Sequence, residues 1–239
     1  MKKLFLISLL SFSALAQVEP LIKNGEVKIN YPCEILDSIP KGKESKETIS
    51  FFERGNNTVY ASGYILRKRA ADFTVKYRTD VGPIVLDETI YQDLLNSPNG
   101  EIKCELDITY DPNHYRTSRS CSFKSETKDP IEEHFVFFKE SFELSQMKEI
   151  KVSSSSWKMK LTPEQEGKSP FIKKPSVERW TLRGECRLEI SGKFESQDGD
   201  PREMDDLTVA GLNFLKNLID TEPSELQGNK TAWVLGIKN

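Results

Sequence analysis

Residues 101–124 read EIKCELDITYDPNHYRTSRSCSFK, and their pattern predicts the frame of this fold. Along both halves of the stretch, apolar residues and cysteines alternate with polar residues. Such alternation is typical of strands with one buried face and one wet face. Between the halves, residues 111–114 have the residue types of a tight turn. The stretch therefore predicts a β-hairpin.

The turn also fixes which residues of the two arms lie opposite each other. If Tyr110 is paired with Tyr115, Cys104 lies directly opposite Cys121. Both cysteines also share the parity of the apolar face. Face and register thus agree, and together they predict a Cys104–Cys121 disulfide.

The four cysteines of the chain are even in number, and they predict two disulfides. Once Cys104 is paired with Cys121, Cys33 is left for Cys186, which would tie the first strand to the last third of the chain. Loop-closure arguments predict that the short bridge stabilises the fold by about 3 kcal/mol and the long one by about 5 kcal/mol. A zinc site is the competing interpretation, but the sequence has no Cys-x-x-Cys pair and only two histidines.

The N-terminal 16 residues have the features of a cleaved signal peptide. Lys2 and Lys3 precede an apolar run over residues 4–10, and residues 14–16 read Ala-Leu-Ala, a small-x-small cleavage site. The run is too short to span a bilayer. We therefore expect a mature chain of residues 17–239 in the periplasm or outside the cell, and the short signal is typical of a bacterial envelope protein.

The composition excludes some partners. The formal net charge is −3, and it becomes −5 without the two lysines of the signal. Charges of both signs are interspersed, so the basic excess of a nucleic-acid-binding protein is absent. No later apolar run is long enough to predict a transmembrane segment.

The whole pattern predicts a mainly β protein, an antiparallel sandwich or barrel of about eleven strands. Two short helices are expected at about 87–96 and 205–219. We expect one β-rich domain over residues 17–239. The alternative is two β subdomains, divided near 125–131 or 162–176.

Several local predictions follow the same alternation. Residues 148–152 and 157–161 predict a second hairpin across Ser153–Ser156, and residues 179–195 a single long strand. Residues 58–66 predict a strand followed by a turn at 67–72. Residues 135–138 and 231–237 predict two further strands.

The sequence offers little for catalysis. His114 lies in the expected hairpin turn and His134 near a strand end, and no Gly-x-Ser-x-Gly elbow surrounds a serine. With both disulfides formed, no thiol is left to act as a nucleophile. We therefore expect no catalytic residue, no metal site and no cofactor, and a binding role rather than an enzyme.

Two groups of cationic residues are candidates for ligand binding. Arg67, Lys68 and Arg69 form the only basic run. As a solvated turn it needs no ligand, but it would also suit an acidic partner or a lipid headgroup. Arg119 has the parity of the hairpin's buried face, opposite Leu106. It is either a snorkelling or paired core arginine, or a residue that reaches a cleft and meets an anionic group.

The leading hypothesis is an exported, disulfide-stabilised binding protein of the cell envelope. Its partner would be a protein, a glycan or a small apolar ligand. The first alternative is a barrel that carries an apolar or lipid ligand in a cavity lined by residues such as Phe137, Trp180 and Leu188. The second is a hydrolase that uses two carboxylates facing each other across a cleft.

Overall fold

The computed structural model describes residues 17–18, 21–70, 72–80, 86–87, 101–111, 114–126, 146–169, 171–224 and 229–237. Its strands are β1 Gln17–Val18, β2 Asn24–Tyr31, β3 Lys41–Glu53, β4 Tyr64–Arg69, β5 Asp72–Thr79, β6 Leu86–Asp87, β7 Glu101–Asp111, β8 His114–Glu126, β9 Lys148–Met159, β10 Lys173–Leu182 and β11 Glu185–Glu195. Its helices are α1 Thr58–Ala61, α5 Pro163–Lys168, α6 Pro201–Lys216 and α7 Lys230–Leu235, with 3-10 turns η1 Cys33–Ser38 and η2 Gly55–Asn57. None of the described helices is long and apolar enough to cross a membrane.

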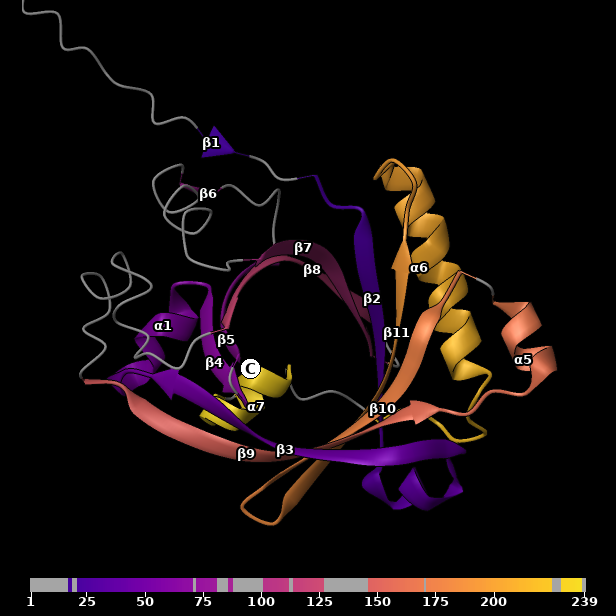
Figure 1. The fold of residues 1–239 in the computed structure, drawn as a ribbon, viewed down its shortest axis with the longest axis horizontal. Coiled ribbons are helices and arrows are strands. Elements are labelled where there is room, and N and C mark those ends of the chain that lie inside the picture. Colours follow the sequence, from indigo (N-terminus) through magenta and orange to yellow (C-terminus); the bar gives the residue numbers. More distant parts are fainter. Residues whose placement is uncertain are drawn as a thin grey trace, which may run out of the picture.

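Nine strands close into a barrel in the order β10-β11-β2-β7-β8-β5-β4-β3-β9 (Figure 1). Neighbouring strands are antiparallel except for β2 and β7, which are parallel. The mainly β fold class is confirmed, with a barrel of nine strands where about eleven strands were expected. A barrel of this strand number has an interior wide enough for side chains or for one small ligand.

The barrel wall has its apolar face on the outside. On β2, Val27 and Ile29 are fully buried and belong to the cluster that packs against α6. Glu26 and Lys28, which alternate with them, line the inside of the barrel. The alternation of the sequence is therefore present, but its polar face points inward and its apolar face is covered by helices.

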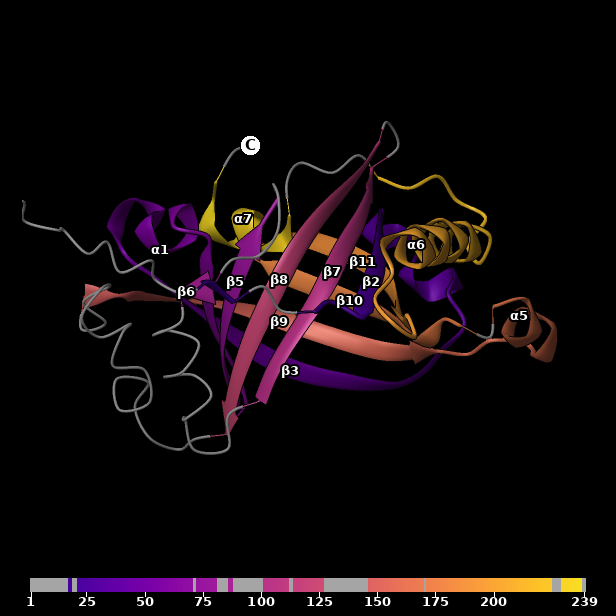
Figure 2. The ribbon, with the colours of Figure 1, turned by 90° about the horizontal axis from the view of Figure 1, so that it is seen from above.

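Helix α6 covers the outer face of β2 and β11 (Figures 1 and 2). Gly211 permits this close contact, because a Cβ there would lie 3.1 Å from Val27. The helix begins at Pro201, and its N-cap is Asp200, whose side chain accepts hydrogen bonds from Arg202 and Glu203. The predicted helix at 205–219 exists but begins and ends earlier, because Asp200 caps the first turn and Pro201 fits the N1 position.

The hairpin at 101–124 is present with the predicted register. In β7 and β8, Tyr110 is paired with Tyr115 and Cys104 with Cys121. Both predicted disulfides, Cys104–Cys121 and Cys33–Cys186, are confirmed. The second bridge ties η1 to β11, two segments separated by 153 residues.

Two strand predictions had the wrong connectivity. Residues 148–159 form one continuous strand, β9, because its serines pair with β3 on one side and β10 on the other instead of turning. Residues 179–195 form two strands, since Arg183 and Gly184 have positive φ angles (52° and 83°) and make the turn between β10 and β11.

Two short segments also differ in type from the prediction. Residues 58–61 form helix α1, and the basic run lies within strand β4 rather than in a turn. The expected strand at 231–237 is helix α7, because Asn229 caps it and Gly236 ends it in the left-handed conformation. The predicted helix at about 87–96, apart from Asp87, and the strand at 135–138 lie outside the described residues.

Helix α7 packs against an apolar group at one end of the barrel interior. Val234 of this helix joins Phe51, Ile65 and Trp180, which come from three strands of the wall. The interior therefore has an apolar end at α7, while the rest of it is lined by polar and charged side chains.

Candidate functional site

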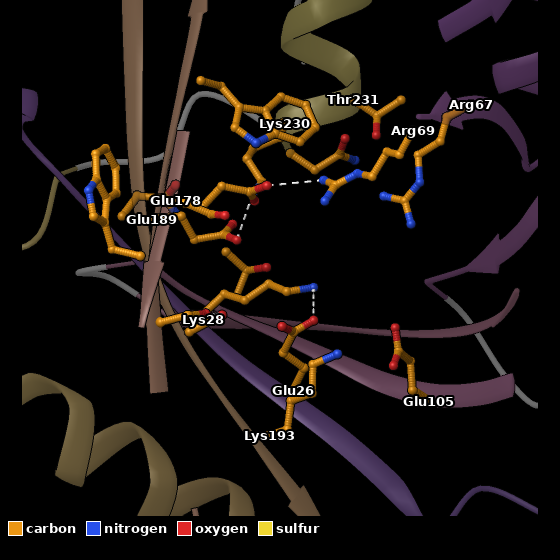
Figure 3. A pocket seen from close by; sticks show the side chains of 18 of the residues that line it. Glu26, Lys28, Arg67, Arg69, Glu105, Glu178, Glu189, Lys193, Lys230 and Thr231 are labelled. Atoms are coloured by element: carbon orange, nitrogen blue, oxygen red, sulfur yellow. Dashed lines mark hydrogen bonds and ion pairs between the residues drawn. The ribbon is translucent and has the colours of Figure 1, made fainter. Parts of the chain in front are cut away.

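A cavity of about 690 Å³ occupies the charged part of the barrel interior (Figure 3). Among the described residues that line it, nine are lysine or arginine and four are glutamate, although the whole chain has a net charge of −3. The cations are Lys28, Lys43, Arg67, Arg69, Lys76, Arg78, Lys158, Lys193 and Lys230, and the acids are Glu26, Glu105, Glu178 and Glu189. The sheet thus gathers an excess of positive charge in a space that the overall composition does not suggest.

The most buried charge of this wall is Asp107 on β7, which is 2% exposed. Its carboxylate accepts hydrogen bonds from Lys28 on β2, from Lys76 on β5 at 2.7 Å and from Ser120 on β8 at 2.9 Å. A nitrogen of Arg78 lies 3.2 Å away. Asp107 therefore holds three cations in place on neighbouring strands.

Burial and neighbouring charges shift the pKa values of the charged side chains around Asp107. Burial by itself would raise the pKa of Asp107, but Lys28, Lys76 and Arg78 lower it well below its usual range. Burial likewise opposes ionisation of Glu105, yet Lys76 and Lys103 lower its pKa to about 2. For Lys28, burial favours the neutral amine, and Asp107 and Glu26 raise its pKa well above the ordinary value. The acids and Lys28 are charged at neutral pH.

A second charged group lies where α7 meets the cavity. Lys230, the first residue of α7, bonds to Glu178 on β10 and lies 2.8 Å from Glu189 on β11. Arg69 on β4 approaches Glu178 from the other side at 3.0 Å. Burial opposes the charge of Glu178, but Lys230 and Arg69 lower its pKa strongly. The ammonium of Lys230 also sits 4.5 Å above the Trp180 ring.

Arg67 differs from the other arginines of the interior. It has neither a hydrogen bond nor an ion pair with any residue in the described ranges, and its Nε is buried without a partner. Burial, followed by the neighbouring Arg69, lowers the pKa of Arg67 to about 10, so it remains a cation at neutral pH. In Figure 3 its guanidinium points into the cavity.

Buried polar atoms without partners are concentrated around this cavity. Among the described residues they include both amide atoms of Asn30 and the Nε atoms of Arg67, Arg69 and Arg78, all on residues that line it. Most buried polar atoms in folded proteins have a partner. All but one of these unpartnered atoms are donors, so the cavity is set up to receive hydrogen-bond acceptors.

Three carboxylates, Glu26, Glu105 and Asp107, offer oxygens within 4.8 Å of one another. Oxygen ligands of this kind suit a divalent cation. However, Lys28 lies 2.9 Å from Glu26, and Lys103 lies 2.9 Å from Glu105. A cation bound there would have to displace lysines from these oxygens.

The structure separates the cationic residues singled out in the sequence. Arg67 and Arg69 line the cavity, whereas Lys68 between them lies on the outer face of β4 and is exposed. Arg119 lies opposite Leu106 as the register predicts, but its predicted burial is wrong, because the side chain is exposed. It is not among the described residues that line the cavity. A ligand role for Arg119 stays a prediction, as does one for the basic run.

Sequence reasoning missed most of the cavity. The signal lies in the polar parity of the strands, where charges of both signs alternate with apolar residues: Glu26-x-Lys28, Lys76-x-Arg78 and Glu105-x-Asp107. Of the three residues proposed to line an apolar cavity, Trp180 lines this one. Leu188 belongs to the outer cluster, and Phe137 lies outside the described residues.

Comparison with known proteins gives a limited result. No protein-family model matches the sequence, and no curated protein matches it. Similar solved structures include a "putative adenylate cyclase" from Bacillus halodurans (15% identity, 89% of this chain and 98% of that chain, TM-score 0.45). A second is HpAC1 from Hippeastrum, described as a "putative adenylyl cyclase" with dominant triphosphatase activity (10% identity, 90% of this chain and 96% of that chain, TM-score 0.46). A third is the PH1819 protein from Pyrococcus horikoshii (10% identity, 89% of this chain and 98% of that chain, TM-score 0.44). At these values no function is transferred to this chain.

Proposed function

We propose that the barrel binds a small, multiply charged anion of the phosphate type in its interior. The observation that carries this proposal is the excess of cations among the described cavity residues, nine against four lining carboxylates, in a chain of net negative charge. Six of these cations are buried or half-buried, namely Lys28, Arg67, Arg69, Lys76, Arg78 and Lys230, and charges held away from water are costly unless they are paired. An anionic ligand removes that cost, and each phosphate oxygen can accept charge-assisted hydrogen bonds from several of these side chains.

The arrangement of the cations favours an extended anion over a single phosphate. Lys28, Arg67 and Lys193 come from β2, β4 and β11, so cationic groups face the cavity from different parts of the wall (Figure 3). A volume of about 690 Å³ lies within the usual range for small-molecule sites. A chain of two or three phosphates, free or in an ester, fits both features. An apolar ligand would offer no acceptor to Arg67, which has no hydrogen bond or ion pair within the described ranges.

We also propose that the protein works outside the cytoplasm. Two disulfides support this, because such bridges persist in oxidising compartments. The signal-peptide pattern of residues 1–16 supports it as well. Cell fractionation of the native source tests this part: mature protein beginning at Gln17 in the periplasm or medium is the expected result, and full-length protein in the cytoplasm would contradict it.

Isothermal titration calorimetry with inorganic tripolyphosphate tests the binding proposal. We expect binding of one anion per chain in the micromolar range, about −8 kcal/mol. Arg67→Met should weaken binding at least tenfold, because Arg67 faces the cavity without an ionic partner. Lys68→Met is the matched control, since it removes the same charge from the opposite face of the same strand. Equal weakening by both substitutions, or no binding by the wild type, would contradict the proposal.

A second candidate is hydrolysis of the bound phosphate chain with the help of a divalent cation. The observation that favours it is the proximity of the Glu26, Glu105 and Asp107 oxygens. A cation held there would polarise the terminal phosphate for attack by water. Release of inorganic phosphate from tripolyphosphate with magnesium or manganese measures this activity. Loss of release in Glu26→Gln, with tripolyphosphate binding retained, is expected; absence of release with every divalent metal would reduce the protein to a binding role.

A further inference from the structure

Among the described residues that line the cavity, Asn30 alone has a neutral side chain with both a donor and an acceptor buried without a partner. It lies on β2 after Glu26 and Lys28, on the same face of the strand, and is 6% exposed. Neither its Oδ1 nor its Nδ2 has a hydrogen-bond partner. Leaving a buried amide unpaired costs free energy at both atoms, and most buried polar groups in folded proteins have a partner.

The backbone hydrogen bond of Asn30 does not account for its unpaired side chain. The Asn30 carbonyl already accepts a hydrogen bond from Ser224 at 2.8 Å, and its side chain takes no part in this contact. The residue opposite on β11 is Glu189, whose carboxylate is engaged by Lys230. An apolar residue of similar size would satisfy the packing without an unpaired amide.

We infer that the ligand of this barrel is an organic phosphate, whose neutral part presents a donor and an acceptor side by side to Asn30. This inference rests on the proposed anion binding and narrows its ligand class. A carboxamide pairs in this bidentate way with the edge of a nucleobase. An inorganic phosphate chain offers acceptors only and would leave the Asn30 acceptor unpaired.

The position of Asn30 is consistent with such a ligand. Alternate residues of a strand are about 7 Å apart, so Asn30 follows Lys28 by that distance along β2. A phosphate held by Lys28 would therefore place the neutral group of an ester near Asn30. Both amide atoms are covered in this structure, so binding requires the side chains around Asn30 to shift.

Binding of a panel of phosphates tests this inference. The probes are inorganic tripolyphosphate, ATP, CTP, GTP and UTP, titrated calorimetrically in buffer with EDTA to prevent turnover. For the wild type we expect at least one nucleotide to bind about tenfold more tightly than tripolyphosphate. In Asn30→Leu that preference should fall to about one, while the tripolyphosphate affinity is unchanged.

Controls separate recognition from structural damage. Thr208→Val removes a buried hydroxyl on α6, outside the barrel, and should leave the preference intact. Asn30→Ala gives a second test if the leucine disturbs the wall, and thermal unfolding verifies that each variant is folded. A wild type that binds no nucleotide more tightly than tripolyphosphate, or a preference that survives in Asn30→Leu, would overturn the inference but not the anion site. Failure of every probe to bind would overturn both.

Discussion

The two faces of the barrel wall are made by the same strands but are stabilised in opposite ways. On the outer face of β2, Val27 and Ile29 pack against α6 and are removed from water. On the inner face, Glu26 and Lys28 form ion pairs around a cavity. The outer face is an ordinary hydrophobic core; the inner face is a charged cluster, which is weak evidence for stability on its own.

This difference indicates which face carries function. Burial of apolar groups is favourable and needs no ligand. Burial of charged groups is costly even when they are paired, and clusters of buried charges with shifted pKa values are concentrated at functional sites. The outer face therefore holds the fold together, and the inner face is where we locate binding.

Removal of Asp107 should be the most damaging single change on the inner face. Asp107→Ala leaves Lys28, Lys76 and Arg78 close together without their shared counter-charge. We expect a loss of about 3–5 kcal/mol in the free energy of unfolding, measured by urea denaturation. Glu164→Ala is the control, because it breaks an exposed pair with Lys168 and should cost less than about 0.5 kcal/mol. Equal effects would show that the inner cluster is not tightly coupled.

The outer face should respond to loss of volume and not to loss of charge. Leu215 on α6 is fully buried in the outer cluster. Leu215→Ala should destabilise the protein by about 2–5 kcal/mol, somewhat less than removal of Asp107 if the helix can settle into the space. Tripolyphosphate affinity of the folded variant should stay within about twofold of the wild type. A large loss of affinity would contradict the division between the two faces.

Acid should weaken the inner face selectively. The pKa of Glu105 is lowered to about 2 in the folded protein, against an ordinary value of 4.5. Its stabilising contribution is therefore fully present above about pH 4.5 and is lost as the pH falls towards 2. The destabilisation caused by Glu105→Gln should be smaller at pH 3 than at pH 7. For Leu215→Ala the destabilisation should be nearly the same at both pH values, and a matching decrease would argue against the assignment to Glu105.

Removal of Arg67 should have the smallest effect on stability. Arg67 makes no ion pair or hydrogen bond with a described residue, and its burial opposes its charge. Arg67→Met should change the free energy of unfolding by less than about 1 kcal/mol or increase it, while weakening tripolyphosphate binding. A strongly destabilised variant would mean that Arg67 has a structural role that its contacts do not show.

The local part of the fold was predictable from the sequence. The 101–124 hairpin depends on neighbouring residues only, so alternation and turn gave its register, and Cys33–Cys186 followed by elimination. Short segments were harder to assign, because the same residue types are found in short helices and in short strands. Residues 231–235 have strand-forming side chains, yet the caps at Asn229 and Gly236 make them helical.

The candidate site was not predicted, because its residues are brought together only when the sheet closes. Alternation shows that a strand has two unlike faces, but it does not show which face points into a closed barrel. The polar residues of β2, β5 and β7 were therefore attributed to solvent, although closure brings Lys28, Lys76 and Asp107 together. Within the basic run, Arg67 and Arg69 are two residues apart, and this spacing is the one sign in the sequence that they share a strand face opposite that of Lys68.

The most direct test of the account is a crystal structure of the protein grown with tripolyphosphate. We predict the anion inside the barrel, with its oxygens bonded to Arg67 and to Lys28 and no anion at Lys68 on the outer face. Tripolyphosphate bound only on the outer surface, with the Arg67 guanidinium making no contact to it, would contradict the claim that the charged inner face is the binding site.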